Sequence, residues 1–292
     1  MTAAPGPRRS ALYMPAANAR ALEKARMLAA DVIIFDLEDA VAPEAKALAR
    51  QQAVAALASG AYGRRELVLR INGLDTAWGA DDLAAAAAAP PDAILLPKPR
   101  AAADIGSVSA AMDQIGLPAR TRLWAMLETP LAILNAGEIA ATGRAPAARL
   151  AVLVMGLNDL AKETSAQIGP DRRAALYWLS ASVTAARAYG LDILDGACND
   201  FRDAAQLDRE CRQGRALGFD GKTLIHPDQI DLANAVFAPP AAEVAWARRI
   251  IAAFAEPAAQ GRGVINVDGR MVELLHVAMA RRTVAVADAI AG

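Results

Sequence analysis

Short apolar runs that end on charged residues recur along most of the chain. The clearest is VIIFDLED at residues 32–39, in which a run of four apolar residues leads into three acidic ones. Similar runs occupy residues 67–70, 93–98, 123–128 and 150–159. A continuous apolar run of this length is typical of a strand buried on both faces, and the charged residue marks the point where the chain leaves the core.

Helical patterns separate these runs and complete a regular alternation. The predicted strands are 10–14, 32–37, 67–70, 93–96, 123–127, 150–155, 191–194 and 221–225. The predicted helices between them are 19–29, 43–57, 81–89, 104–115, 131–141, 172–189 and 204–217. Each crossover between parallel strands must place its helix outside the sheet, so this alternation predicts an α/β fold, a TIM (β/α)8 barrel. An open, doubly wound sheet is the alternative.

The pattern changes after His226. The elements expected there are helices at 229–236 and 243–254, a hairpin at 261–269 and a terminal helix at 271–291. These residues are surplus to a barrel. We therefore predict a catalytic barrel over residues 1–236, followed by a helical and hairpin extension over residues 237–292 that packs as an arm on a neighbouring subunit.

Composition narrows the function classes. The chain carries 31 basic and 32 acidic residues, so it has no net positive charge that would favour nucleic acid or an anionic membrane as a partner. No apolar run approaches the ~18 residues that a membrane span requires. Cys198 and Cys211 are the only cysteines and form no metal-binding motif, which favours reduced, structural thiols. We expect a soluble cytoplasmic protein.

The charged strand ends are the candidate site. They supply Glu38, Arg70, Lys98, Glu128 and Asp159. In such barrels the carboxyl ends of the strands meet at one mouth, whereas the interior is filled by branched apolar residues. Five charged endings are therefore expected to lie together and to do chemistry.

Glu128 and Asp159 are the best candidates for metal ligands. Hard carboxylate oxygens suit Mg²⁺ or Mn²⁺, which leave positions open for water and substrate. The alternative is that both carboxylates only cap the helices that follow them. Arg70, with its planar fork of donors, is the candidate for binding a substrate carboxylate.

A second group lies at the first strand and its helix. Tyr13, Arg20 and Lys24 belong to it, and the last two are four residues apart, so both project from one helical face. They could bind a nucleotide diphosphate, although a solvated helix face explains them as well. Asp195, at the end of the seventh strand, is a candidate for substrate binding, and capping of a loop is its alternative role.

Nine motifs in order match a known family. They are RSALYMP, FDLEDAVAPEAKALAR, LRIN, LLPK, LETP, GLNDLA, DFRD, GFDGKTLIHPDQI and GRGVINVDGRMVE. With this set the chain resembles the citrate lyase beta-subunit-like enzymes, which include malyl-CoA and citramalyl-CoA lyases. The match extends over nearly the whole chain.

The resemblance implies a role for several residues. It implies that Glu128 and Asp159 hold Mg²⁺ and that Arg70 contacts the substrate acid. It also places Tyr13, Arg20 and Lys24 near coenzyme A. Family members form trimers or larger oligomers such as hexamers, and in several lyases an aspartate of the C-terminal DGxMID segment reaches a neighbour's active site. Glu273 occupies that position in this chain.

The expected reaction is a Mg²⁺-dependent cleavage, or formation, of a 3-hydroxy acyl-CoA thioester such as malyl-CoA or citramalyl-CoA. The products are an acyl-CoA and a 2-oxo acid, and Glu273 is the candidate that protonates the thioester enolate. One alternative is the beta subunit of a citrate lyase complex that acts on a citryl-acyl carrier protein. The other is a class II aldolase that acts on free 4-hydroxy-2-oxo acids.

Further side chains are expected around the metal without binding it. Glu38 is expected to contact a metal-bound water, with Lys46 and Arg50 as its charge partners, and Lys98 is expected in the same surrounding layer.

Overall fold

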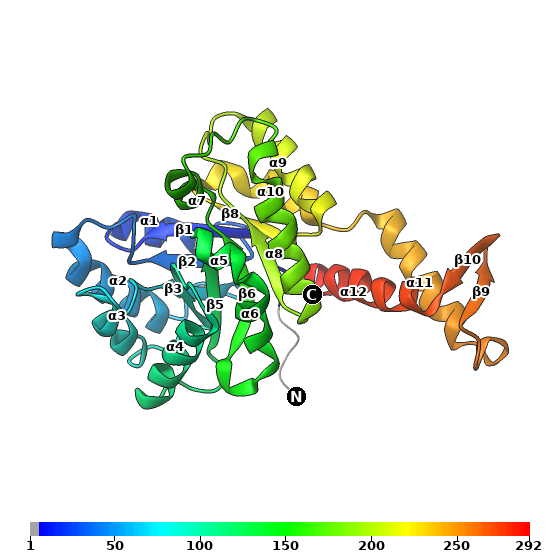
Figure 1. Ribbon diagram of the computed structural model, residues 1–292, viewed down its shortest axis with the longest axis horizontal. Helices are drawn as coiled ribbons and strands as arrows, with labels where there is room; N and C mark the ends of the chain where they lie inside the picture. The colour runs from blue at the N-terminus through cyan, green and yellow to red at the C-terminus, as the bar shows by residue number, and fades with distance from the viewer. Residues whose placement is uncertain (1–5) are drawn as a thin grey trace. The chain divides into compact units, whose positions relative to one another are not determined.

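The computed structural model describes residues 6–292 and contains a closed barrel of eight parallel strands in sequential order (Figure 1). This confirms the predicted TIM-barrel fold. The strands are β1 (Ser10–Pro15), β2 (Val32–Asp36), β3 (Glu66–Arg70), β4 (Ala93–Leu96), β5 (Arg122–Leu127), β6 (Leu150–Met155), β7 (Asp192–Asp195) and β8 (Gly221–Leu224). Each pairs with the next, and β1 pairs with β8 to close the barrel.

Helices follow the strands and alternate with them along the chain. They are α1 (Ala19–Ala25), α2 (Lys46–Ala58), α3 (Gly79–Ala86), α4 (Ala102–Gln114), α5 (Pro130–Leu134), α6 (Ala136–Ala141), α7 (Leu157–Thr164), α8 (Leu176–Ala188), α9 (Ala204–Leu217) and α10 (Ile230–Phe237). Among residues 6–292, no helix combines the length and the apolar character needed to cross a membrane.

The barrel interior is apolar, as the strand pattern predicts. Val32, Ile34, Val68, Leu95 and Trp124 are among the fully buried residues of one cluster that several strands share. The ladder between β2 and β3 pairs Asp36 with Arg70 at the carboxyl ends of both strands. The interior therefore stops at the mouth, where charged side chains replace apolar ones.

One predicted helix was wrong, and one helix of the structure was not predicted. The predicted single helix over residues 131–141 is two helices, α5 and α6, that meet at Asn135. The missed helix is α7, which has eight residues and follows β6 directly. Only Leu157 and Leu160 of α7 are buried, and two positions are too few to establish a helical period.

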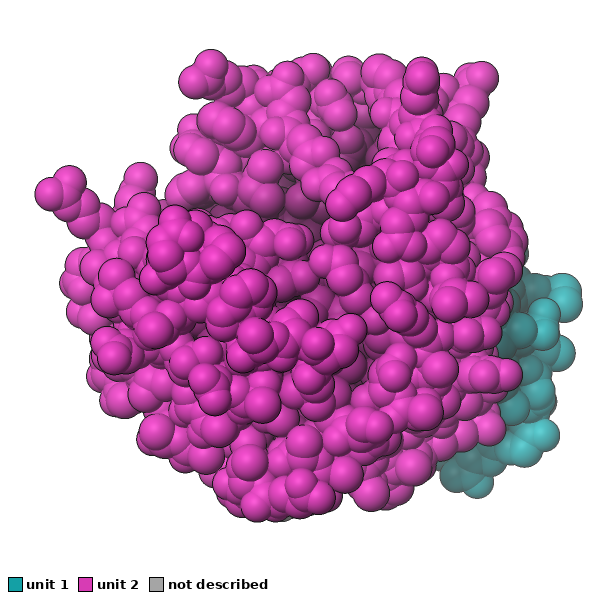
Figure 2. Space-filling view, turned by 60° about the vertical axis from the view of Figure 1, so that its left-hand side comes forward, with its two compact units in different colours: residues 1–7, 235–292 teal, residues 8–234 magenta. Residues whose placement is uncertain are grey.

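The chain divides into two compact units, residues 8–234 and residues 1–7 with 235–292 (Figure 2). The second unit contains α11 (Ala241–Ala255), the hairpin β9 (Val264–Val267) and β10 (Arg270–Glu273), and α12 (Leu274–Ala291). The antiparallel hairpin and both helices share a small apolar core that includes Ile250, Val272 and Val277. This unit therefore has a core of its own.

Candidate active site

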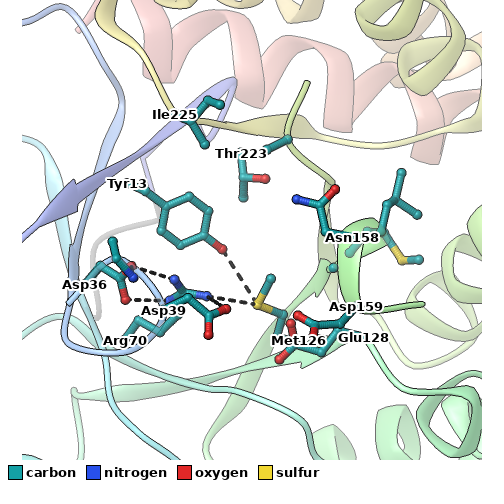
Figure 3. Close-up of a pocket in the computed structure, with 15 residues that line it drawn as sticks. Tyr13, Asp36, Asp39, Arg70, Met126, Glu128, Asn158, Asp159, Thr223 and Ile225 are labelled. Atoms are coloured by element: carbon teal, nitrogen blue, oxygen red, sulfur yellow. Dashed lines mark hydrogen bonds and ion pairs between the residues drawn. The ribbon is translucent and has the colours of Figure 1, made fainter. Parts of the chain in front are cut away.

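A cavity of about 320 Å³ lies at the carboxyl ends of the barrel strands (Figure 3). Tyr13 of β1, Arg70 of β3, Met126 and Glu128 at the end of β5, and Asp159 of α7 line it. Four of these five side chains were predicted from the sequence as site residues. The charged strand ends supplied Arg70, Glu128 and Asp159, and the group at the first strand supplied Tyr13.

Glu128 is completely buried, and its two oxygens have different surroundings. Oε1 accepts a hydrogen bond of 2.8 Å from the backbone N–H of Lys98, whereas Oε2 has no hydrogen-bond partner. Burial, together with the negative charge of Glu38, raises the pKa of Glu128 to about 8. A buried carboxylate oxygen without a partner is costly, and a bound cation would satisfy it.

Gly156 makes room for this carboxylate. A Cβ atom at Gly156 would lie 2.3 Å from Cβ of Glu128 and 2.7 Å from its Oε2. No side chain fits at such distances, so the glycine of GLNDLA allows β6 and α7 to approach the end of β5. The approach brings Asp159, in the first turn of α7, beside Glu128 (Figure 3).

Glu128 and Asp159 fit a magnesium ion. Glu128 does not cap the next helix, because the Thr129 side chain does so by accepting a hydrogen bond from Ala132. Mg²⁺ is commonly bound through one or two carboxylates, with water and substrate oxygens as its other ligands. Residues 6–292 contain no group of three or more His, Cys, Asp or Glu side chains that could hold a metal ion. Two carboxylates beside an open cavity match the magnesium pattern.

Lys98 connects the carboxylates of three strand ends. Its backbone is left-handed, with φ of 51°, and this conformation accompanies the hydrogen bond from its N–H to Glu128. Its Nζ lies 2.9 Å from Oε1 of Glu38 and 4.0 Å from Oδ2 of Asp159. Although burial opposes the charge, the Glu38 carboxylate raises the pKa of Lys98, so the ammonium group stays charged.

Glu38 is paired differently from the prediction. Its carboxylate lies 2.7 Å from Nη1 of Arg70 and 2.9 Å from Nζ of Lys98. The expected charge partner Lys46 instead donates to the backbone oxygens of Leu37 and Glu38 and to the Asn72 side chain.

The other expected partner of Glu38 is also engaged elsewhere. Arg50 pairs with Asp82, at 2.9 Å. Lys46 therefore holds backbone oxygens and Asn72, Arg50 joins α2 to α3, and neither side chain forms an ion pair with the Glu38 carboxylate.

Arg70 is held in place by Asp36, which the sequence did not single out. Nε and Nη2 of Arg70 lie 2.7 and 2.5 Å from the two Asp36 oxygens, a bidentate pair with both side chains buried. Burial opposes its charge, but the Asp36 carboxylate outweighs this and raises the pKa of Arg70. The guanidinium also lies over the Tyr13 ring, 4.7 Å from its centre. Arg70 is thus a fixed cation at the cavity wall.

Two exposed residues of the predicted group lie outside this cavity. Arg20 and Lys24 are on the surface of α1 and line neither the cavity just described nor a second one. The second cavity, of about 620 Å³, lies over the ends of β2 to β4, and Glu38, Lys46 and Lys98 are among its lining residues. The contact of Arg20 and Lys24 with coenzyme A stays a prediction.

Asp195 does not face the cavity. It is completely buried and pairs with Arg172 at 2.8 Å and with Lys222 at 3.1 Å. Lys222 lies opposite Asp195 in the β7 to β8 ladder, which places both side chains on one side of the sheet. The position does not support the predicted contact of Asp195 with substrate and assigns it to a buried ion network.

Glu273 belongs to the other unit. It is the last residue of β10, its side chain is exposed, and its backbone N–H donates to Nδ1 of His276.

Comparison with known proteins identifies relatives along the whole chain. The family model described as HpcH/HpaI aldolase/citrate lyase matches residues 9–227. A (3S)-malyl-CoA thioesterase of Cereibacter sphaeroides (strain KD131 / KCTC 12085) is 52% identical over 285 residues, which are 98% of this chain and 96% of the relative. The citrate lyase subunit beta of Escherichia coli (strain K12) is 35% identical over 91% of this chain and 88% of its own.

A solved structure supports the same relationship. Protein CitE from Mycobacterium tuberculosis, in complex with magnesium, acetoacetate and coenzyme A, is similar with a TM-score of 0.75 and 30% identity. The similarity covers 98% of this chain and 99% of that one.

Proposed function

Because the chain belongs to the HpcH/HpaI aldolase/citrate lyase family, we propose that it is a Mg²⁺-dependent enzyme that hydrolyses (3S)-malyl-CoA or a close analogue. The carboxylate pair Glu128 and Asp159 beside the fixed cation Arg70 carries this proposal, because the three can bind the charged end of a hydroxy acid. The relative that is 52% identical favours hydrolysis as the reaction.

Each group at the mouth has a defined task in this proposal. Glu128 and Asp159 hold the ion, and Arg70 uses the edge that faces the cavity to orient the substrate carboxylate. Mg²⁺ held there, or Mn²⁺ in its place, would supply positive charge to the oxygens at the acid end of the malyl group. Lys98 pairs with Glu38 and, together with Arg70, opposes the burial that raises the pKa of the Glu38 carboxyl group.

Hydrolysis consumes one water molecule. Its oxygen attacks the thioester carbonyl carbon, the bond between carbon and sulfur breaks, and coenzyme A leaves with the proton that the water loses. A base must take that proton, and the proposed base is Glu273 of a neighbouring copy. Malate and coenzyme A are the products.

Carbon–carbon cleavage is the second candidate, favoured by the citrate lyase beta subunits among the relatives. In this reaction the hydroxyl proton leaves, the bond between the hydroxyl carbon and the next carbon breaks, and the thioester enolate takes a proton. From malyl-CoA the products are glyoxylate and acetyl-CoA. The same charged groups serve both reactions, so the geometry at Glu128, Asp159 and Arg70 does not separate them.

Product analysis separates the two reactions. Purified protein is incubated with (3S)-malyl-CoA and Mg²⁺, and mass spectrometry measures malate, free coenzyme A, glyoxylate and acetyl-CoA. Malate with free coenzyme A supports hydrolysis, whereas glyoxylate with acetyl-CoA supports the lyase. The Asp159→Asn variant is the control for catalysis by the site, and it should form neither set of products.

Two other substrate classes are tested in the same assay. Citryl-acyl carrier protein tests for a citrate lyase beta subunit, and a free 4-hydroxy-2-oxo acid tests for a class II aldolase. Turnover of either one without turnover of malyl-CoA would contradict the proposal.

The proposed oligomer brings Glu273 to a neighbour's cavity. Apolar side chains beside it are exposed to an unusual degree, with Met271 75%, Leu274 59%, Leu275 55% and Met279 63% exposed. Exposed apolar surface of this kind marks an interface with another chain. We propose a trimer or hexamer in which residues 237–292 pack on a neighbouring copy.

Subunit mixing tests the shared site. The inactive Glu273→Gln and Glu128→Gln chains are produced together, so that mixed oligomers contain intact sites built from one chain of each kind. Activity that appears only in the mixture supports a site shared between copies. A mixture as inactive as the separate variants contradicts it.

A further inference from the structure

We propose that the Tyr13 hydroxyl group donates a hydrogen bond to the carbonyl oxygen of the bound thioester and stabilises the negative charge that develops there. The inference rests on the proposed function, because it needs a thioester in the cavity. It assigns Tyr13 a catalytic role, beyond the contact with coenzyme A that the resemblance implies.

The position of Tyr13 carries the first part of the argument. Its ring packs against the apolar barrel cluster on one side and against the Arg70 guanidinium on the other. The hydroxyl group points toward the middle of the cavity (Figure 3). Its acceptor in the protein is Sδ of Met126, at 3.8 Å. A thioether sulfur is a weak acceptor, so this donor is available for a stronger one.

Arg70, the cation that lines the cavity, is largely engaged by carboxylates of the protein. Arg70 donates two hydrogen bonds to Asp36, and its remaining nitrogen lies 2.7 Å from Glu38 and donates to Sδ of Met126 at 3.9 Å. Its remaining N–H groups suit the substrate carboxylate, which carries a full negative charge in every state of the reaction. It is therefore poorly suited to bind selectively the charge that forms at the thioester.

The other neutral side-chain donors of the lining, Thr223 and Asn158, have stronger acceptors in the protein. Oγ1 of Thr223 donates to the backbone oxygen of Asp195 at 3.1 Å. The Asn158 and Asn199 amides exchange two hydrogen bonds, at 3.1 and 2.7 Å. Among the cavity-lining side chains in residues 6–292, Tyr13 is thus the neutral donor whose hydrogen bond goes to a weak acceptor, a thioether sulfur.

The chemistry requires such a donor. Water attack turns the thioester carbonyl oxygen into a tetrahedral alkoxide, and carbon–carbon cleavage turns it into an enolate oxygen. Negative charge grows on the same atom in both cases, so one O–H donor serves either reaction. Burial raises the pKa of Tyr13, which keeps the phenol protonated and able to donate. No proton needs to move, because the hydrogen bond alone stabilises the charge.

The Tyr13→Phe variant tests the donor, because it keeps the ring that packs against Arg70 and removes only the oxygen. Loss of one donor to a developing oxyanion lowers kcat by about 10²-fold. We expect that loss with (3S)-malyl-CoA, while the affinity for free coenzyme A changes less than about twofold. Tyr177→Phe, at an exposed tyrosine of α8, is the matched control and should leave kcat unchanged.

Two inert analogues locate the hydrogen bond. Both are analogues of succinyl-CoA, which lacks the hydroxyl group of the malyl substrate, and in both a methylene group replaces the thioester sulfur. One analogue keeps the carbonyl group, now as a ketone, and the other has a methylene group in its place. A neutral hydrogen bond is worth about 1 kcal/mol, or roughly a fivefold change in Kd. Calorimetry should show that Tyr13→Phe raises the Kd of the ketone analogue by about that factor and leaves the Kd of the methylene analogue unchanged.

The outcomes are distinct. A Tyr13→Phe variant with wild-type kcat overturns the inference while leaving the proposed function in place. An equal rise in Kd for both analogues also overturns it, because Tyr13 would then contact the coenzyme A part of the ligand and not the carbonyl oxygen. A wild-type protein that neither hydrolyses nor cleaves malyl-CoA overturns the proposed function itself, and the donor role with it.

Discussion

Replacement of Glu128 by glutamine should change how the stability of the metal-free protein depends on pH. The folded state raises the pKa of Glu128 from 4.5 to about 8, mainly through burial. A carboxyl group whose pKa is raised by folding contributes stability that is complete below pH 4.5 and is lost as the pH rises through 8. Glutamine has the same shape and does not titrate, so it removes this loss.

The magnitude follows from the shift. Each pKa unit corresponds to about 1.4 kcal/mol, so the whole shift of Glu128 corresponds to about 5 kcal/mol. About 4 kcal/mol of this falls between pH 5 and pH 8.5. The difference in unfolding free energy between Glu128→Gln and wild type should therefore grow by about that amount, in favour of the variant, across this interval.

Urea unfolding with EDTA, at one protein concentration and at pH 5, 7 and 8.5, measures the difference. The Glu163→Gln variant is the control, because Glu163 lies in the neighbouring helix α7 with its side chain exposed. A difference between Glu128→Gln and wild type that stays constant from pH 5 to pH 8.5 would refute the reasoning. Added Mg²⁺ should stabilise the wild type at pH 8.5, by about 2.7 kcal/mol at 100 times its Kd, and leave the variant unchanged.

Three further changes test the parts of the site. Lys98→Met removes the ammonium group 4.0 Å from Asp159, so Mg²⁺ should bind several-fold more tightly in calorimetry; a weaker affinity contradicts a purely electrostatic role. Gly156→Ala forces a Cβ against Glu128 and should abolish Mg²⁺ binding, whereas Gly137→Ala, with open space around it, should bind Mg²⁺ as the wild type does. Arg70→Lys keeps the charge but loses the bidentate fork, so kcat/KM for malyl-CoA should fall by about 10²; a change below about threefold would exclude Arg70 from substrate binding.

The strand ends of the site were predictable because the strands are parallel. All strands of a parallel barrel point the same way, so a charged residue after each apolar run must arrive at the same mouth. Arg70, Glu128 and Asp159 could be selected from the sequence for this reason, and one cavity contains all three. The closed barrel itself followed from eight alternations of strand and helix.

The pairing of these groups could not be predicted in the same way. The bond between Asp36 and Arg70 depends on the register of β2 and β3, which apolar runs do not reveal. Asp195 also ends a strand, yet its side chain lies in a buried ion network, because a shift of one residue along a strand reverses the face that it occupies.

Nearness in sequence also misled the assignment of Lys46. A lysine eight residues after Glu38 suggested a charge pair, but the fold directs the ammonium group to backbone oxygens and to Asn72. Contacts of this kind depend on the path of the loops. Lys98 likewise has a left-handed backbone conformation, which brings its N–H to Glu128, and the sequence does not predict it because the residue is not a glycine.

The most direct test of the central claim is the identity of the products formed from (3S)-malyl-CoA, measured with Mg²⁺, with EDTA, and with the Asp159→Asn variant. The account predicts malate and free coenzyme A in the presence of Mg²⁺, and neither product when the metal or Asp159 is removed. Formation of malate and coenzyme A at an undiminished rate in EDTA, or no turnover of malyl-CoA at all by the wild-type protein, would contradict it.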